Sequence, residues 1–312
     1  MGRGPSLSSF SLDLPGHQGG KVRESWTLSD HRRLLVTTDR LSAFDKIIGT
    51  VPHKGQVLNQ LAAWWFDQTK DIVANHVIEL PDPNALIAID AVPLPVEVVV
   101  RARLTGSTST SVLPRYLAGE RELYGYTLPD GIEPHGALPE LLLTPTTKAQ
   151  HGAHDEPITV AAVEEQGLVE SALWQQVQNV AMAVFRRGQR IAEDAGFVLA
   201  DTKYEFGLDP NGELLLIDEV HTPDSSRYWA IDSLDDRLAA GLAPESYDKE
   251  PVRLALKAIG YTGDGPPPEL PDAVWAETSA RYVQLYERLT RTAFVPGETP
   301  IEDRLQSNLG GL

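Results

Sequence analysis

The chain has 312 residues, of which 42% are hydrophobic and 23% are charged. These proportions are typical of a folded protein with one large or two ordinary domains. Its formal net charge is −17, so it lacks the cationic surface that binding to nucleic acid or an acidic membrane requires. It contains no cysteine, which excludes disulfides, thiolate metal sites and a cysteine nucleophile. We therefore expect a cytoplasmic globular protein, without a nucleic-acid or membrane partner, whose anionic ligands are bound by local clusters of Arg and Lys.

The first hundred residues are predicted to be rich in β-structure. Residues 21–28 and 32–39 have the composition of two strands joined by a short turn. Residues 57–73 carry apolar side chains at helical spacing and are predicted to form an amphipathic helix. Prolines in residues 81–95 indicate a connection between subdomains, and a further strand is expected at residues 96–104.

The remainder of the chain alternates between polar segments and strongly periodic ones. Residues 105–160 are rich in Thr, Ser, Gly and Pro, which predicts a long functional loop. Residues 170–195 have the clearest helical pattern, and Gly196 supplies its end. Strands are expected at residues 197–207 and 213–220, on either side of a DPNG turn. Two more helices are predicted nearer the C-terminus, at residues 246–260 and 272–291.

The DPNG turn decides which residues of its two strands face each other. If Asn211 and Gly212 form the type I′ turn that this dipeptide favours, Glu205 lies directly opposite Asp218. Two carboxylates at that spacing are destabilising unless a cation lies between them. Mg²⁺ prefers a coordination shell in which one or two carboxylates are completed by phosphate oxygens. In this register Lys203 stands diagonally beside Asp218.

A second register is equally compatible with the local sequence. Pro210 suits the first central position of a type I turn that is followed by a glycine bulge. Glu205 then faces Ile217 in place of Asp218. The residues alone leave the two registers open, so this hairpin does not by itself establish a metal site.

The second of these strands ends in a high density of charge. The run LLLI at residues 214–217 is apolar enough for a buried strand, whereas Asp218, Glu219, Asp224 and Arg227 follow closely. A charge at the end of a buried strand needs a partner or a ligand. In a regular strand Glu219 points to the opposite face, so Asp218 is the favoured metal ligand.

A glycine-containing segment near the N-terminus offers a place for a phosphate. Gly16, Gly19 and Gly20 precede Lys21 and Arg23 in PGHQGGKVRE. Glycines let backbone amides approach a phosphate, and a following lysine can neutralise its charge. The spacing matches neither the P-loop nor the dinucleotide fingerprint, so those folds are disfavoured.

Two further segments carry groups that suit anionic ligands. Arg101 and Arg103 alternate on one face of their predicted strand, and Ser107 follows in the turn TGSTSTS. Paired arginines with nearby hydroxyls suit a phosphate or a carboxylate. The segment 144–159 is predicted to be a loop, and it offers Lys148, His154 and Asp155.

Several of these segments occur in the order found in one enzyme family: GGKVRES, TTDRLSAFD, KGQVLNQ, PVEVVVRARLTGSTSTS, LLTPTTKA, HDEPIT, LADTKYEFG and LLLIDEVHTPDSSRYW. Over residues 19 to about 250 the chain resembles SAICAR synthetase, the purine-biosynthesis ligase that joins aspartate to a carboxylated aminoimidazole ribotide with ATP. The resemblance implies a two-lobed α+β fold similar to that of ATP-grasp enzymes. We expect an antiparallel β-rich nucleotide-binding lobe at residues 1–94, a larger α/β lobe with the metal and substrate sites at 95–295, and a loosely held tail at 296–312.

The resemblance also implies a role for individual residues by matched position. Lys203, Glu205 and Asp218 resemble the catalytic residues, and Glu205 and Asp218 among them resemble the Mg²⁺ ligands. The residues implied to bind ATP are Gly19, Gly20, Lys21, Arg23 and Glu97. The residues implied to bind the other substrates are Arg101, Ser107, Lys148, His154, Asp155, Asp224, Ser225 and Arg227.

The activity that the resemblance implies needs no protein nucleophile. ATP converts the ribotide carboxylate into an acyl phosphate, and the aspartate amine then displaces phosphate while Mg²⁺ and Lys21 stabilise the transferred charge. The chain departs from the family at Val112–Pro114, where Leu-Trp is usual. This leaves two alternatives, a paralogous ligase that acts on a different azole carboxylate in a specialised nucleoside pathway and a small-molecule phosphotransferase. The oligomeric state stays open, a homo-oligomer included.

Overall fold

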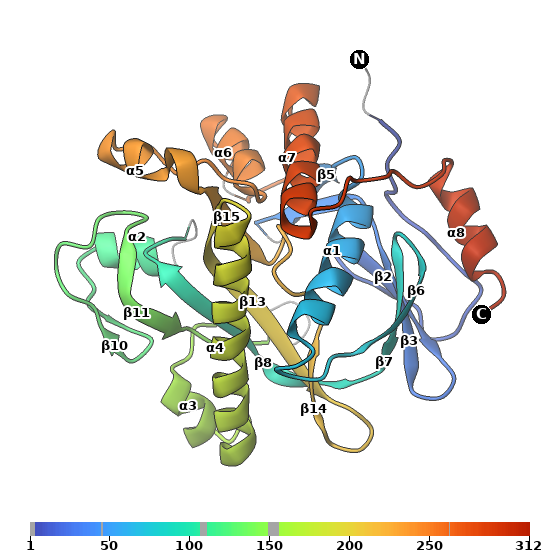
Figure 1. The fold of residues 1–312 in the computed structure, drawn as a ribbon, viewed down its shortest axis with the longest axis horizontal. Helices are drawn as coiled ribbons and strands as arrows, with labels where there is room; N and C mark the ends of the chain where they lie inside the picture. Colours follow the sequence, from blue (N-terminus) through green and yellow to red (C-terminus); the bar gives the residue numbers. More distant parts are fainter. Residues whose placement is uncertain (1–3, 45, 107–110, 149–155, 262) are drawn as a thin grey trace.

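The N-terminal part of the chain forms a five-stranded antiparallel sheet. The computed structural model of the protein describes residues 4–44, 46–106, 111–148, 156–261 and 263–312 (Figure 1). In spatial order the strands are β1 (Gln18–Gly19), β2 (Arg23–Leu28), β3 (Arg32–Thr37), β7 (Ala85–Ile89) and β6 (Val77–Asp82). Asp30 and His31 have positive φ angles, of 58° and 56°, and they make the turn that was predicted between β2 and β3. A separate hairpin follows, made of β4 (Arg40–Ala43) and β5 (Lys46–Thr50).

The chain passes from the first sheet to the second within residues 81–95, where a connection between subdomains was predicted, but the connection is only two residues long. Strands β6, β7 and β8 (Val92–Arg103) follow one another there with only short turns between them. Pro81 is tolerated because β6 is the last strand of its sheet, and edge strands accommodate proline. Asp82 begins the turn to β7, since its carboxylate accepts a hydrogen bond from the Asn84 N–H at 2.8 Å.

A second, six-stranded antiparallel sheet carries most of the charged residues singled out in the sequence. Its path runs through β11 (Ala137–Leu143), β8, β13 (Phe197–Leu208) and β14 (Leu214–Ile217), with β12 (Thr146–Thr147) paired to β8 and β15 (Ser226–Ala230) paired to β13. In β13 the even-numbered Tyr204 is fully buried in the core. On the other face Arg101 lies opposite Asp201, and Glu97 lies opposite Glu205. One face of β8 and β13 is therefore apolar and the other is charged.

The DPNG turn adopts the second of the two predicted registers. The Gly212 N–H donates to the Asp209 carbonyl oxygen at 3.0 Å, and Gly212 has a positive φ of 83°, as a glycine bulge after a type I turn requires. Glu205 consequently faces Ile217 and not Asp218. The two carboxylates reach one site by another route, because the strand ends before Asp218.

The predicted helix at residues 170–195 is α4 (Ser171–Asp194), which packs on the apolar face of the second sheet (Figure 1). Its buried stripe consists of Trp174, Val177, Ala181, Val184, Phe185 and Ala192. The Glu170 carboxylate caps the first turn by accepting the Leu173 N–H at 3.0 Å. Gly196 follows the last turn with a φ of 79°, in the position where glycine ends helices.

The helix predicted at residues 57–73 is α1 (Lys54–Thr69), which begins one turn earlier than expected. The Asp39 carboxylate holds this first turn by accepting the Gly55 N–H at 2.7 Å. Helix α1 packs against α7 (Asp272–Thr290). Three further helices contact other elements: α3 (Val160–Glu165) packs on α4, α5 (Ile231–Ala239) on β15 and α6 (Glu250–Ala258) on α7.

The prediction of one long loop over residues 105–160 is wrong for its described part. That part contains α2 (Val112–Leu117), a hairpin of β9 (Glu122–Leu123) and β10 (Tyr126–Thr127), and the strands β11 and β12. These elements share a small core that includes Leu104, Val112, Tyr116, Leu123 and Leu138. The polar composition hid this core because its apolar residues are spaced irregularly.

The prediction of a loosely held tail at the C-terminus is also wrong. Helix α8 (Ile301–Leu309) buries Leu305 and Leu309 in the core of the N-terminal sheet (Figure 1). Arg304 donates to the buried Asp82 carboxylate at 2.9 Å.

The predicted lobe boundary at residue 94 falls inside β8. The division of the chain into a nucleotide-binding lobe and a substrate lobe stays a prediction. Within the described residues, none of the helices combines the length and the apolar character needed to cross a membrane.

Candidate functional site

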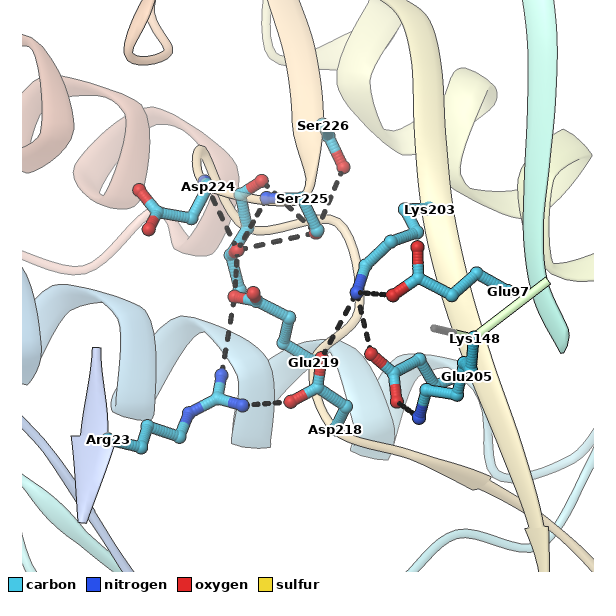
Figure 2. A network of polar contacts seen from close by, with 11 residues as sticks. Arg23, Glu97, Lys148, Lys203, Glu205, Asp218, Glu219, Asp224, Ser225 and Ser226 are labelled. Carbon is cyan, nitrogen blue, oxygen red and sulfur yellow. Dashed lines mark hydrogen bonds and ion pairs between the residues drawn. The ribbon is translucent and has the colours of Figure 1, made fainter. Parts of the chain in front are cut away.

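Charged side chains from both sheets meet around Lys203 (Figure 2). Its ammonium group lies 2.9 Å from Glu97 Oε1, 2.6 Å from Glu205 Oε1 and 3.8 Å from Asp218 Oδ2. Burial opposes the charge of Lys203, but the three carboxylates outweigh it, and its pKa lies well above the ordinary value. Lys203 is therefore a permanent positive charge among three acids.

Arg23, at the start of β2, connects the N-terminal sheet to this group of acids (Figure 2). Its guanidinium donates to the Asp218 carboxylate and lies 3.4 Å from Glu219 Oε2. Burial alone raises the pKa of Asp218, but Arg23 and Lys203 outweigh burial and lower that pKa to about 2. Asp218 is therefore ionised at neutral pH, as a metal ligand must be.

The prediction that Glu219 points away from the site is wrong. Strand β14 ends at Ile217, and Asp218 has a left-handed backbone with a φ of 66°. The alternation of a regular strand stops there, so Glu219 reaches Arg23 and accepts a hydrogen bond from the Thr222 hydroxyl. Burial raises the pKa of Glu219. Asp218 and Glu219 are thus both part of the charged group.

Glu205 and Asp218 are the two carboxylates that suit the implied metal. Both lie against Lys203, and Glu205 also accepts a hydrogen bond from Lys148. In the part of the chain that the structure describes, no cluster of three or more acids or imidazoles has the geometry to bind a metal unaided. The pair fits Mg²⁺ nevertheless, because that ion usually keeps several waters and takes substrate phosphates as ligands.

Two arginines share one buried carboxylate further along the same face. Arg101 and Arg227 each donate to Asp201 Oδ2, at 2.6 and 2.7 Å. Arg101 also donates to the Thr144 hydroxyl at 3.0 Å. Glu250 and Asp248 also act on Arg227, so the two guanidinium groups are balanced by nearby acids, and a phosphate or carboxylate ligand would compete with these acids for them. Ser107, predicted to act beside them, lies outside the described residues.

Each end of this charged face opens into a cavity. The first has a volume of about 190 Å³ and lies where β3, β7 and the start of β8 approach the end of β14. Its lining includes Leu35, Ala88, Ile89, Pro93, Glu205 and Asp218. Arg33, His76 and Asp90 line it as well. Partly apolar walls with Glu205 and Asp218 at one side suit a flat heterocycle that carries a charged, metal-bound group.

The second cavity has a volume of about 220 Å³ and lies at the arginine end. Its lining includes Thr105, Gly106, His135, Arg227, Trp229 and Lys257. Burial lowers the pKa of His135, so the charged groups of this cavity are the cations Arg227 and Lys257 and the carboxylate of Glu250. This combination suits the phosphorylated part of a small molecule.

The glycine segment lies at the hairpin that carries Arg23. Gly19 is paired with Glu24 across β1 and β2, and the Gly20 N–H donates to the Arg23 carbonyl oxygen at 2.7 Å. Lys21 is exposed in the turn between these strands. The predicted ATP-binding residues Gly19, Gly20, Lys21 and Arg23 thus share one hairpin, whereas Glu97 belongs to the opposite sheet.

Residues 218–226, which we call the site loop, connect β14 to the first residue of β15. The Lys203 N–H donates to the Ser225 carbonyl oxygen at 3.0 Å, and the Ser226 N–H donates to Thr222 at 2.9 Å. Asp224, predicted to bind substrate, points away from Lys203 (Figure 2). The positions of His154 and Asp155, also predicted to bind substrate, lie outside the described residues.

Two residues of this region were not singled out from the sequence, and a third was placed on the wrong face. Asp201 precedes Lys203 by two residues on the same strand face, so the period of a strand could have identified it. Lys54 lies within the quoted motif KGQVLNQ, but nothing in its neighbourhood signals that it is buried. Glu219 was assigned to the wrong face because the sequence does not show that β14 ends at Ile217.

The fold is that of an α+β protein in which two cavities, of about 190 and 220 Å³, are joined by a line of carboxylates and cations, an arrangement typical of enzymes that act on charged small molecules. A family model described as SAICAR synthetase matches residues 17–267. The chain is 48% identical over 304 residues to a putative phosphoribosylaminoimidazole-succinocarboxamide synthase 2 of Mesorhizobium japonicum. The match covers 96% of this chain and 97% of that protein.

Two further similar proteins belong to the same family. A phosphoribosylaminoimidazole-succinocarboxamide synthase of Legionella pneumophila is 42% identical, with 97% of each chain covered. The solved structure of the SAICAR synthase of Saccharomyces cerevisiae, complexed with SAICAR, superposes with a TM-score of 0.78 at 30% identity, and the match covers 93% of this chain and 100% of that one. The chain belongs to the SAICAR synthetase family, which confirms the resemblance found in the sequence and the α+β fold class.

Proposed function

We propose that the chain is an ATP-dependent ligase that condenses L-aspartate with the carboxylate of carboxyaminoimidazole ribotide, forming SAICAR, ADP and phosphate. The observation that carries the proposal is the charged face of β8 and β13. Arg101 and Asp201 lie at one end of it, Lys203 in the middle and Glu205 at the other end. Four residues of a strand span about 13 Å, which suits a phosphorylated azole lying along this face.

The nucleotide is placed in the cavity at the Glu205 end. Leu35, Ala88 and Ile89 offer apolar walls for the adenine ring, and the triphosphate then extends toward the carboxylates. The hairpin with Lys21 and Arg23 lies on the same side, so its amides and cations are available to the phosphates. Arg23 exchanges its present contact with Asp218 for a phosphate contact in this proposal.

Glu205 and Asp218 would hold Mg²⁺ in this proposal, since that ion takes carboxylates together with phosphate oxygens and water. When bound there, the ion neutralises the negative charge that develops on the transferred phosphoryl group. Arg23 and Lys203 already neutralise Asp218 in the protein alone. The acids are therefore held in place before the nucleotide arrives, and the change needed on binding is the move of Arg23 from Asp218 to a phosphate.

The ribotide lies with its phosphate at Arg101 and Arg227 and its carboxylate near Lys203. A carboxylate oxygen attacks the γ-phosphorus of ATP, and the bond from that phosphorus to ADP breaks. The aspartate amine then attacks the acyl carbon, the amide forms and inorganic phosphate leaves. Lys203 orients the carboxylate as a cation and does not act as a base, because its raised pKa keeps it protonated. Lys148 contacts Glu205, and the predicted residues His154 and Asp155 are assigned to the aspartate side by the family resemblance alone.

The proposal is tested by supplying ATP, Mg²⁺ and the ribotide with a panel of amino acids and identifying the product by mass. ADP and phosphate are expected only with aspartate, and the product carries one added aspartate. Glu205→Ala and Asp218→Ala are each expected to lower kcat about 100-fold or more. Glu213→Ala, an exposed acid on the same hairpin, is the control and keeps full activity.

Two outcomes of this assay contradict the proposal in different ways. Release of ADP without aspartate, with phosphate transferred to the ribotide, identifies a phosphotransferase. A product formed only from another azole carboxylate identifies a ligase of different specificity.

A further inference from the structure

Asp224 has both carboxylate oxygens bound to the protein. Its Oδ2 lies 2.9 Å from the ammonium group of Lys54, at the start of α1. Its Oδ1 accepts a hydrogen bond from the Tyr282 hydroxyl of α7, also at 2.9 Å. The Asp224 side chain is 4% exposed and that of Lys54 is 0% exposed. A substrate cannot reach either group in this arrangement, so their contact is internal to the protein.

Lys54 is attached to the N-terminal sheet as well as to the site loop. The Asp39 carboxylate holds the next residue, Gly55, and also accepts the Leu7 N–H at 2.6 Å. A Cβ atom on Gly55 would lie only 2.3 Å from the Thr37 carbonyl oxygen. The first turn of α1 is thus in direct contact with the end of β3, which fixes the position of the Lys54 ammonium group.

The carboxylate that Lys54 holds is adjacent to the functional part of the site loop. Ser225, the next residue, is bonded through its carbonyl oxygen to the N–H of Lys203. The Thr202 and Ser226 hydroxyls lie 2.7 Å apart, which ties the end of the site loop to β13. A displacement of Asp224 would therefore be transmitted to Ser225 and to the strand that carries Lys203.

The cost of burying these charges indicates that the contact is maintained for a purpose. Burial opposes the ionised form of Asp224, but Lys54 and Lys249 outweigh burial and lower its pKa to about 2. A buried ion pair is no more stabilising than a well-packed apolar pair of similar size, although removing one partner is strongly unfavourable. In some proteins such pairs are retained because they impose a specific geometry, and the contacts of Asp224 with α1 and α7 fit that explanation.

We propose that Lys54 and Tyr282 are positioning residues that act through Asp224 to fix the site loop, and that this arrangement is required to bind the ribotide. The inference rests on the proposed ligase function. It adds that helices α1 and α7, neither of which contributes a residue to the charged face of the second sheet, set the geometry of the substrate end. The nucleotide end lies at the other end of the site loop, where Asp218 is held by Arg23 and Lys203, and its remaining walls come from β3 and β7, so we expect it to depend much less on this contact.

The kinetic test compares Tyr282→Phe and Lys54→Met with the wild type. Loss of a hydrogen bond to a charged group predicts a rise of about tenfold in the KM for the ribotide in Tyr282→Phe. The KM for ATP should change by less than about twofold, a difference that general destabilisation does not produce. Tyr286→Phe, one turn later on α7, is the matched control and should behave as wild type. If Lys54→Met does not fold, Tyr282→Phe carries the test.

A double-mutant cycle shows whether Lys54 acts through Asp224. In the Asp224→Asn background, Lys54→Met should add less than about a threefold further effect, because the contact is already lost. Effects that multiply, equal rises in both KM values, or wild-type kinetics in folded Tyr282→Phe would each overturn the inference.

Hydrogen exchange separates this inference from the proposed function. The amides of Lys203 and Ser226, which bond to the site loop and within it, should exchange faster in Tyr282→Phe than in wild type or Tyr286→Phe. Unchanged protection of these amides overturns the positioning role, whatever the activity. A wild-type protein with no ligase activity, combined with faster exchange in the variant, refutes the proposed function and leaves the positioning of the loop established.

Discussion

Single residues of the charged group keep their ionisation state over a wide pH range because each has a partner of opposite charge. Arg23 and Lys203 lower the pKa of Asp218 to about 2, against the effect of burial. Glu205, Asp218 and Glu97 raise the pKa of Lys203, again against burial. The positions of these charges are therefore set by folding and do not depend on the ligand, which is the condition for electrostatic preorganisation.

Asp248 differs from these residues because its charge is not balanced. It is 1% exposed, its Oδ1 accepts the Glu250 N–H at 2.6 Å, and no described residue hydrogen-bonds its buried Oδ2. Burial and the neighbouring Glu250 raise its pKa to about 7. An unfolded aspartate has a pKa of about 3.9, so between pH 4 and 7 the folded protein binds this proton more tightly than the unfolded chain does.

We predict that Asp248 makes the protein less stable as the pH rises from about 4 to about 7. Three pKa units correspond to about 4 kcal/mol at most. Asp248→Asn keeps the oxygen that accepts the Glu250 N–H and removes the charge, so it should raise the free energy of unfolding by about 2–4 kcal/mol at pH 8 and by much less at pH 4.5. Urea unfolding at the two pH values measures this difference.

Asp218 and Asp224 contribute with the opposite sign. Their lowered pKa values stabilise the folded protein above pH 4, and this stabilisation is lost as the pH falls toward 2. A variant Asp248→Asn that is equally stabilised at pH 4.5 and pH 8 would show that its effect is due to packing and not to charge.

Among the secondary-structure elements, the strands and helices with strong periodicity could be predicted and the ends of elements could not. The alternation in β13 and the apolar stripe of α4 are both visible in the sequence. The end of β14 at Ile217 depends on the left-handed backbone of Asp218, a conformation that only the packing of the site loop imposes. Local chemistry singled out candidate residues and the family motif gave them roles, whereas their convergence needed the structure.

Helix α8 is the element whose prediction failed most clearly, because nine residues with three apolar positions carry little periodic signal. Its contacts with the N-terminal sheet lead to a prediction about stability. Removing residues 296–312 takes the side chains of Ile301, Leu305 and Leu309 out of the core and exposes the apolar residues that they cover. This should lower the free energy of unfolding by about 4–8 kcal/mol. Chemical denaturation of the shortened chain measures the change.

The matched control removes only residues 310–312, which are exposed and follow the last buried leucine. That variant should unfold as the full chain does. If removal of residues 296–312 has no larger effect than this control, α8 is not part of the folded core.

For the molecule as a whole, the function depends on bringing a nucleotide and an azole carboxylate together between two sheets. The net charge of −17 repels both anionic substrates at long range, and binding depends on the few cations that line the cavities. This explains why Arg23, Arg101, Lys203 and Arg227 are each paired with an acid in the protein alone. The pairing holds the cations in place until a ligand competes for them.

The central claim is that ATP activates the azole carboxylate for attack by aspartate, and transfer of oxygen tests it most directly. The ribotide is prepared with both carboxylate oxygens labelled with ¹⁸O, and the products of a complete reaction with ATP, Mg²⁺ and aspartate are analysed by mass. The account predicts one ¹⁸O in the released phosphate and one in the amide of the product. Phosphate without label, or label retained entirely in the azole product, would contradict it.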